Sequence, residues 1–143
     1  MNKKAERFQA FLDEKEIKNA FQMEETNDKW DTVIFRSQID INSNKLPTML
    51  LFDTSVYGLM RVLIAPKLPS EENEAAVLKL INGYNKRLKA FKYYVDDDGA
   101  LLMDVCLLAP ETEDPGPMVY AMYDVIIQHL TECYKDIMRS VWG

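Results

Sequence analysis

The chain has 143 residues, of which 48% are hydrophobic and 28% charged, and a net charge of −6 at pH 7. This length fits one domain, residues 1–143, that can bury its own core, and its two cysteines are too few for a disulfide framework. The acidic balance argues against a nucleic-acid partner, because binding to nucleic acids depends on neutralising phosphates with Lys and Arg.

The first half of the chain predicts one helix followed by three strands. Residues 3–15 carry apolar side chains at helical spacing, without the apolar run of a secretory signal, and residues 17–29 are polar and are interpreted as a helix end and a loop. Apolar and polar residues alternate over 33–41, which is typical of a strand with one buried face. The stretch INSNKLP then predicts a break, and the short apolar runs 48–53 and 57–65 predict two further strands.

The second half predicts a helix, a hairpin and a long final helix. Ser70 is a favoured N-cap for a helix over 71–89, which has acidic residues in its first turn. Residues 91–95 and 100–108 read as paired strands. Residues 118–142 have a helical pattern with apolar side chains on more than one side. Such a helix is covered either by another chain or by other elements of its own domain, and the sequence leaves both readings open.

The resulting order is α-β-β-β-α-β-β-α. Because sequential hairpins favour an antiparallel sheet with helices packed on one face or at its ends, we predict an α+β domain. No stretch approaches the roughly 20 apolar residues of a membrane span, so we expect no membrane partner. Because the chain shows no secretory signal and has only two cysteines, we expect a cytoplasmic location.

The tip of the second hairpin contains three aspartates and a glycine, Asp96 to Gly99, and raises the question of a metal site. An EF-hand loop aligned on Gly99 would place Tyr94 and Val105 at its first and last ligand positions. Neither residue is a calcium ligand through its side chain. Asp-Gly between two β-rich runs is instead a strong hairpin signal, so we interpret this segment as a turn.

His129 and Cys133 lie one helical turn apart and form the only other candidate pair. A closed zinc site needs four ligands, and a nucleophilic cysteine needs a lowered pKa and a third orienting group. The chain has one further cysteine, Cys106, and no second histidine, so we interpret the pair as packing. No phosphate loop, nucleophile elbow or zinc signature occurs, and we predict no catalytic residue, no cofactor and no metal.

The stretch INGYNKRLKAFKYYVDDDGALLMDVCLLAP resembles the central part of YbjN-family domains, where a helix with spaced asparagines runs into a hairpin with an acidic tip. Asn82 and Asn85 occupy the helix positions, and Asp96 to Gly99 occupy the tip. The element order is similar to the type III secretion chaperone-like fold. The resemblance implies a small acidic protein that binds protein segments as a dimer and is not an enzyme, while YbjN-like members are described only as regulatory or sensory.

Two hypotheses follow for the function. The first is a non-enzymatic module, chaperone-like or a regulatory adaptor, that binds a protein or peptide as a homodimer through a sheet face or the last helix, with Met122, Ile126 and Tyr134 as contacts. The second is a ligand-sensing or catalytic domain that uses carboxylates in a pocket between sheet and helices. Its candidate residues are Asp53, Asp96 and Asp104. We favour the first hypothesis because no catalytic constellation is visible.

Overall fold

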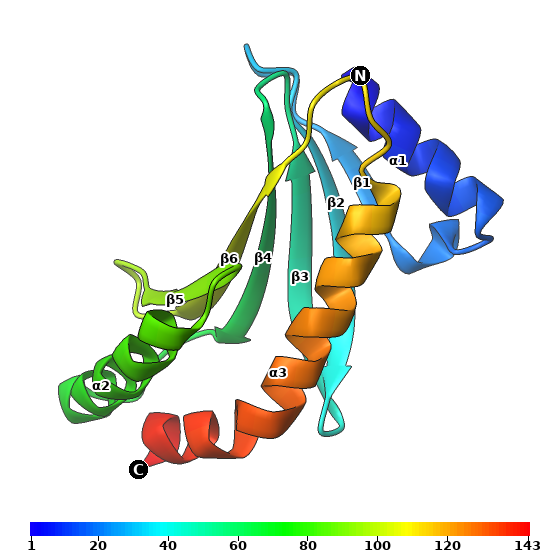
Figure 1. The fold of residues 1–143 in the computed structure, drawn as a ribbon. Helices are drawn as coiled ribbons and strands as arrows, with labels where there is room; N and C mark the ends of the chain where they lie inside the picture. The colour runs from blue at the N-terminus through cyan, green and yellow to red at the C-terminus, as the bar shows by residue number, and fades with distance from the viewer.

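Six antiparallel strands form one sheet in the order β1-β2-β3-β4-β6-β5 in the computed structural model, which describes residues 1–143 (Figure 1). The strands are β1 (Gln22–Glu25), β2 (Val33–Ile41), β3 (Asn44–Phe52), β4 (Tyr57–Ala65), β5 (Phe91–Val95) and β6 (Leu101–Leu108). The helices are α1 (Lys3–Glu14), the short 3₁₀ helix η1 (Lys18–Ala20), α2 (Glu71–Arg87) and α3 (Gly116–Trp142). The α+β class and the antiparallel sheet predicted from the sequence are therefore confirmed.

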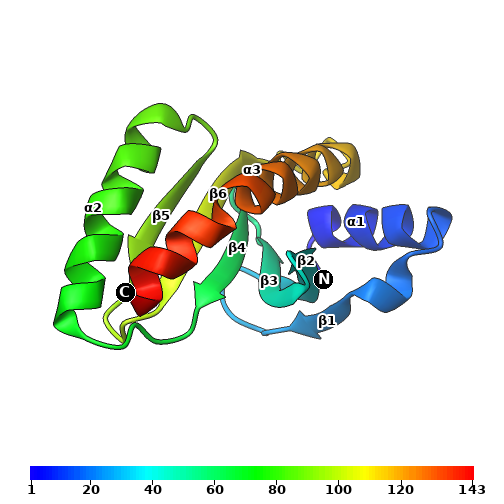
Figure 2. The same ribbon diagram turned by 90° about the horizontal axis from the view of Figure 1, so that it is seen from below.

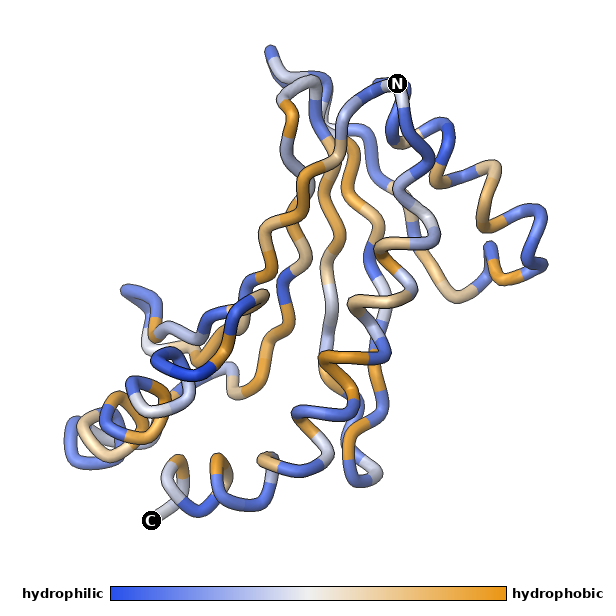
Figure 3. Tube along the Cα trace, viewed as in Figure 1, coloured by the Kyte–Doolittle hydropathy of each residue, from blue (hydrophilic) through white to orange (hydrophobic).

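The core lies between one face of the sheet and the helices. One cross-strand row of fully buried side chains runs across five strands, with Phe35 opposite Leu50, Leu50 opposite Met60, and Val105 between Met60 and Phe91. Side chains alternate between the two faces of a strand, so the opposite face carries a different set of residues. Figure 3 shows hydrophobic residues concentrated in the central strands and on the turns of α3 that cross them.

The helices cover this face in different places. From α1, the ring of Phe8 packs edge-on against Phe35 and Phe52. The long helix α3 crosses the sheet and contacts α1, β2 and α2, while α2 also packs on β5 (Figure 2). In α3, a single stripe is fully buried: Val119, Ile126, Leu130, Ile137 and Val141. Its remaining apolar side chains are partly or largely exposed, so the domain covers α3 only in part.

One strand was missed by the sequence prediction, which assigned residues 17–29 to a helix end and a loop. This segment contains η1 and β1, and β1 pairs antiparallel with β2 from Gln22 opposite Arg36 to Glu25 opposite Val33. All four residues of β1 are exposed. Because neither face of β1 is buried, the strand lacks the apolar alternation by which sequence patterns reveal strands.

The break between strands is also shorter than the predicted stretch INSNKLP. Only Asn42 and Ser43 form the turn between β2 and β3. Both have positive φ, 50° and 69°, as a tight two-residue hairpin turn requires. Strand β3 begins directly at Asn44 and includes Pro47. Pairing of β3 with β4 starts only at Thr48, so the missing N–H of Pro47 removes no ladder hydrogen bond.

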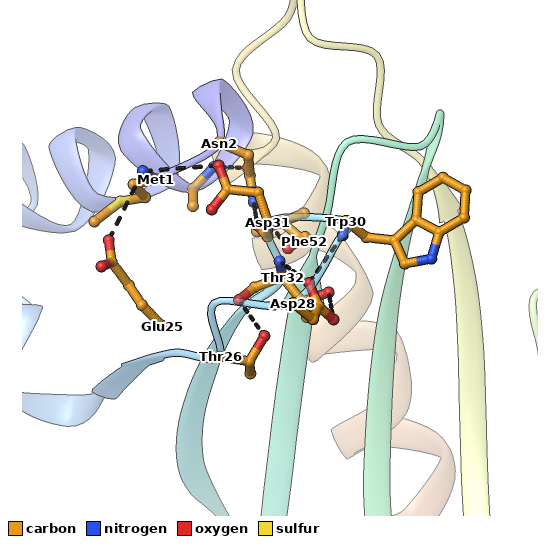
Figure 4. Close-up of polar contacts among 10 residues, drawn as sticks. Met1, Asn2, Glu25, Thr26, Asp28, Trp30, Asp31, Thr32 and Phe52 are labelled. Carbon is orange, nitrogen blue, oxygen red and sulfur yellow. Dashed lines mark hydrogen bonds and ion pairs between the residues drawn. The ribbon is translucent and has the colours of Figure 1, made fainter.

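The N-terminal residues tie α1 to the sheet through buried polar contacts (Figure 4). The Asn2 side chain caps α1 by accepting from the N–H of Ala5, and it donates to the carbonyls of Asp31 (2.8 Å) and Phe52 (2.9 Å). Lys4 is fully buried, and its ammonium donates to the carbonyls of Ser55, in the loop after β3, and of Tyr57, the first residue of β4. Desolvation by burial lowers the pKa of Lys4.

The loop that precedes β2 is held in shape by one carboxylate. Asp28 accepts from the N–H and the hydroxyl of Thr32 and from the N–H of Trp30. Hydrogen bonds from Thr32 are the main cause of the lowered pKa of Asp28. In Figure 4 the indole of Trp30 points away from this carboxylate, and half of the Trp30 surface is exposed.

The Asn2 contacts predict a large loss of stability on truncation. Asn2→Ala removes an N-cap, which costs about 0.5–2 kcal/mol, and leaves one carbonyl of β3 and one of the loop before β2 without their donor, so we expect a total loss of about 2–3 kcal/mol in the free energy of unfolding. Urea unfolding measures the loss. The exposed Asn44→Ala serves as the matched control and should change stability by less than about 0.5 kcal/mol. Equal losses in the two variants would contradict this assignment.

Candidate functional site

Half of the outer edge of β2 has no neighbouring strand. The strand spans nine residues, but β1 pairs only with its first part, Val33 to Arg36. Beyond Gln22 the chain turns away from the sheet into η1. Residues 37–41 therefore form an open sheet edge, called here the free edge, next to the hairpin turn between β2 and β3 (Figure 1).

The backbone groups that point outward at the free edge belong to Gln38 and Asp40. On the β1 side of β2, the Thr32 carbonyl accepts from the N–H of Thr26 at 3.0 Å. Backbone direction alternates along a strand, so every second residue after Thr32 points to the same side. The N–H and C=O of Gln38 and Asp40 form no hydrogen bond within the chain. The free edge thus presents two donors and two acceptors in strand geometry.

An apolar groove lies beside the free edge, between β2 and α3, and we call it the aromatic groove. Its volume is about 420 Å³, within the usual range of ligand pockets. Its main apolar walls are Phe21, Ile39, Tyr120, Tyr123 and Ile127. The rings are held in place by contacts of their own, since Tyr123 lies edge-on to Phe21 and its hydroxyl lies 3.1 Å from the Ser37 hydroxyl. Burial raises the pKa of Tyr123.

A second hollow of about 540 Å³ lies by the same edge and is mostly polar, so we call it the polar groove. Its charged lining residues are Arg36, Asp40 and Lys45. Both cations are already paired, Arg36 with Glu24 at 3.3 Å and Lys45 with Asp40 at 3.0 Å. The free edge therefore runs between an apolar and a polar hollow. This arrangement suits a chain segment with two chemically different sides.

The three partner contacts predicted from the sequence lie in different environments. Ile126 has no exposed surface and packs in the core. It is therefore not available for contact with a partner in this structure. Met122 and Tyr134 are partly buried against the core, and Tyr134 lines a separate hollow near the end of α3. The residues of α3 that line the aromatic groove beside the free edge are instead Tyr120, Tyr123, Asp124 and Ile127.

His129 and Cys133 meet as their spacing predicted, and the fold adds a third group. The Tyr93 hydroxyl lies 2.6 Å from Nε2 of His129, and the Cys133 sulfur lies 3.8 Å from Nδ1. The imidazole is also packed against the rings of Tyr84 and Phe91. Burial raises the pKa of Tyr93 and lowers that of His129, so burial favours the neutral form of the imidazole. This cluster joins α2, β5 and α3, and neither groove at the free edge includes it.

The carboxylates of the alternative hypothesis are dispersed. Asp53 accepts from Ser55 in the loop between β3 and β4, and Asp104 forms a bidentate pair with Arg61 on β4, at 2.8 and 2.9 Å. Asp96 accepts from the N–H groups of Asp98 and Ala100 and so closes the turn between β5 and β6. Gly99 has a φ of 81°, as this turn requires. The hairpin prediction for this segment is confirmed, and each of the three carboxylates has a separate structural partner.

Comparison with family models and with curated proteins gives no match. No family model matches the chain, and no curated protein is similar to it at a significant level. The resemblance to YbjN-family domains stays a prediction. None of the helices is long and apolar enough to cross a membrane, and nowhere do three or more His, Cys, Asp or Glu side chains come together in a group that could hold a metal ion.

The environment of His129 predicts a loss of stability at mildly acidic pH. Burial lowers the pKa of His129 from 6.5, so protons bind the unfolded chain more tightly than the folded one. The free energy of unfolding therefore keeps its full value above the pKa that His129 has in the unfolded chain. It decreases as the pH falls through that pKa. We expect the free energy of urea unfolding to be smaller at about pH 5.5 than at about pH 7.5. In His129→Gln this decrease should shrink, and an unchanged decrease would contradict the prediction.

Proposed function

We propose that this protein is a non-enzymatic module that binds an extended segment of a partner protein as an added strand at the free edge of β2. The observation that carries the proposal is the pair of residues Gln38 and Asp40, whose outward backbone groups have no partner in the chain. An exposed strand edge is a template for pairing with another chain, and proteins commonly protect such edges. Here the protection by β1 stops half-way, at Arg36.

The grooves support the proposal because they supply pockets for side chains, which backbone pairing alone does not provide. In strand addition, main-chain hydrogen bonds provide affinity and pockets for alternate side chains provide specificity. The aromatic groove and the polar groove lie beside the same backbone segment, residues 37–40. The candidate catalytic carboxylates, in contrast, are distributed over two loops and one strand. We therefore place the binding of peptide segments above a carboxylate-based activity.

We also propose that the protein forms a homodimer, through the sheet face that no helix covers. At one end of this face Tyr57 and Leu108 are more than half exposed, and the loop residues Trp30 and Val56 beside these strand ends are about half exposed; we call these four residues the upper apolar patch. Tyr57 pairs with Leu108 across β4 and β6, and the Thr54 N–H bonds the Trp30 carbonyl, so the patch is drawn together from three segments. Contiguous exposed apolar surface that includes Trp and Tyr is typical of protein interfaces.

Proline at position 38 tests the binding proposal. Gln38→Pro removes an outward N–H but no hydrogen bond to β3, so the sheet should stay intact while strand addition is blocked. Gln38→Ala is the matched control, since it keeps the N–H and loses the side chain. Peptides selected from a random displayed library on the unmodified protein should bind Gln38→Ala normally and Gln38→Pro at least about tenfold more weakly.

Fluorescence anisotropy measures these affinities, and thermal unfolding checks that both variants fold. Equal binding of the selected peptides to the two folded variants would overturn the strand-addition proposal. So would a selection on the unmodified protein that enriches no peptide at all.

A charge in the upper apolar patch tests the homodimer. Leu108 is 63% exposed, so Leu108→Glu should leave the fold intact while it places a charge in the interface. Sedimentation velocity should show that the dissociation constant of the dimer is larger by on the order of tenfold. Leu78→Glu, on the exposed side of α2, is the matched control and should dimerise like the unmodified protein. A monomer at all concentrations, or equal effects of both changes, would contradict this interface.

A further inference from the structure

We infer that the free edge of β2 selects an extended peptide in which apolar residues alternate with polar ones and whose net charge is positive. This inference rests on the proposed function, because it names the chemical class of segment that the free edge would take. The inference is carried by the positions of the two grooves. The aromatic groove lies on one side of Gln38 and Asp40, and the polar groove lies on the other.

The alternation follows from strand geometry. A strand added beside β2 points successive side chains to opposite faces of the sheet, whichever direction it runs. Directly paired residues share a face, so ligand residues opposite Ser37 and Ile39 lie on the helix side, over the aromatic groove. Ligand residues opposite Gln38 and Asp40 lie on the uncovered side, by the polar groove. Two successive ligand residues therefore meet different chemistry.

The aromatic groove favours apolar side chains on the helix side. Tyr120 is 40% exposed, while Phe21 and Ile127 are only partly buried against the core, so an apolar ligand side chain would remove more of their surface from water. The groove is already shaped, because Tyr120 lies edge-on to Phe11 and Tyr123 to Phe21. Little side-chain reordering is needed on binding, which favours affinity.

The charge around the free edge favours a basic ligand. The cations of the polar groove, Arg36 and Lys45, are both paired with carboxylates of this chain. Asp124, on the rim of the aromatic groove, forms no ion pair, and no cationic residue lines that groove. The charge left without an ion pair at the edge is therefore the carboxylate of Asp124, in a chain with a net charge of −6; it lies on the helix side, so it favours a basic ligand through its field and not by pairing with the ligand's polar-side residues. Opposite charge on a ligand speeds encounter and disfavours acidic competitors.

Three short synthetic peptides with a fluorescent label test this class. The first alternates valine or phenylalanine with lysine. The second has the same composition with its apolar residues in one block, and the third keeps the alternation but replaces lysine with glutamate. We expect the first to bind at least about tenfold more tightly than either of the others, by fluorescence anisotropy. Its binding should also slow amide hydrogen exchange at Gln38 and Asp40, which are the N–H groups expected to gain partners.

Two variants locate the binding on the protein. Tyr120→Ala removes a wall of the aromatic groove and should lower the affinity for the first peptide at least about fivefold. Trp142→Ala, which removes an exposed aromatic side chain of the same helix outside the groove, is the matched control and should leave the affinity for this peptide unchanged. Asp124→Asn should reduce the preference for lysine over glutamate. Thermal unfolding confirms that each variant is folded.

The outcomes separate the peptide class from the proposed function. Suppose that the alternating peptide and the peptide with one apolar block bind with equal affinity, and that Gln38→Pro abolishes the binding of both. This result would overturn the alternation and leave strand addition standing. Failure of the first peptide to bind would overturn the inferred class, while the library selection on the same protein still decides whether any extended peptide adds to β2. Slow exchange at Gln38 and Asp40 that depends on protein concentration, without peptide, would mean that a second copy occupies the edge, and this would overturn the inference.

Discussion

The pairing of β2 with β3 is the interaction on which the rest of the structure depends. It joins all nine residues of both strands, and the two-residue turn at Asn42 and Ser43 fixes its register. This register directs Val33, Phe35 and Ile39 to the helix face, where the core forms. A slip by one residue would turn every side chain of β2 to the opposite face, so the hydrophobic core and the hairpin turn enforce one another.

The same register also creates the candidate binding edge. The Thr32 carbonyl bonds toward β1, and every second residue of β2 after it points to the same side. The backbone groups of Gln38 and Asp40 therefore point outward, past the residues of β2 that pair with β1. The short length of β1 follows from the 3₁₀ turn at η1, which directs the chain away from the sheet and toward α1. A longer β1 would satisfy these groups and cover both grooves. In this fold, therefore, the short edge strand and the candidate binding edge have the same structural origin.

Polar anchoring of α1 explains how a helix near the end of the sheet is held in one orientation. Asn2 and Lys4 donate to four carbonyls, which come from the loop before β2, the end of β3, the loop after β3 and the start of β4. A buried ammonium is costly to desolvate unless acceptors replace its water, and Lys4 has two of them. Such contacts add direction to the non-directional packing of Phe8 and its neighbours. The position of α1 in turn places Phe11 against Tyr120, a wall of the aromatic groove.

The sequence by itself determined the elements whose signal is local. The alternation in 33–41, the Ser70 cap and the Asp-Gly hairpin each predicted an element that the structure contains, because periodicity, capping and turn chemistry act between residues close in the chain. Only the tertiary structure decided that the exposed segment 22–25 is a strand, that Ile126 is core, and that Tyr93 joins His129 and Cys133. It also decided which part of β2 stays free. These facts depend on contacts between distant segments, and no local pattern encodes them.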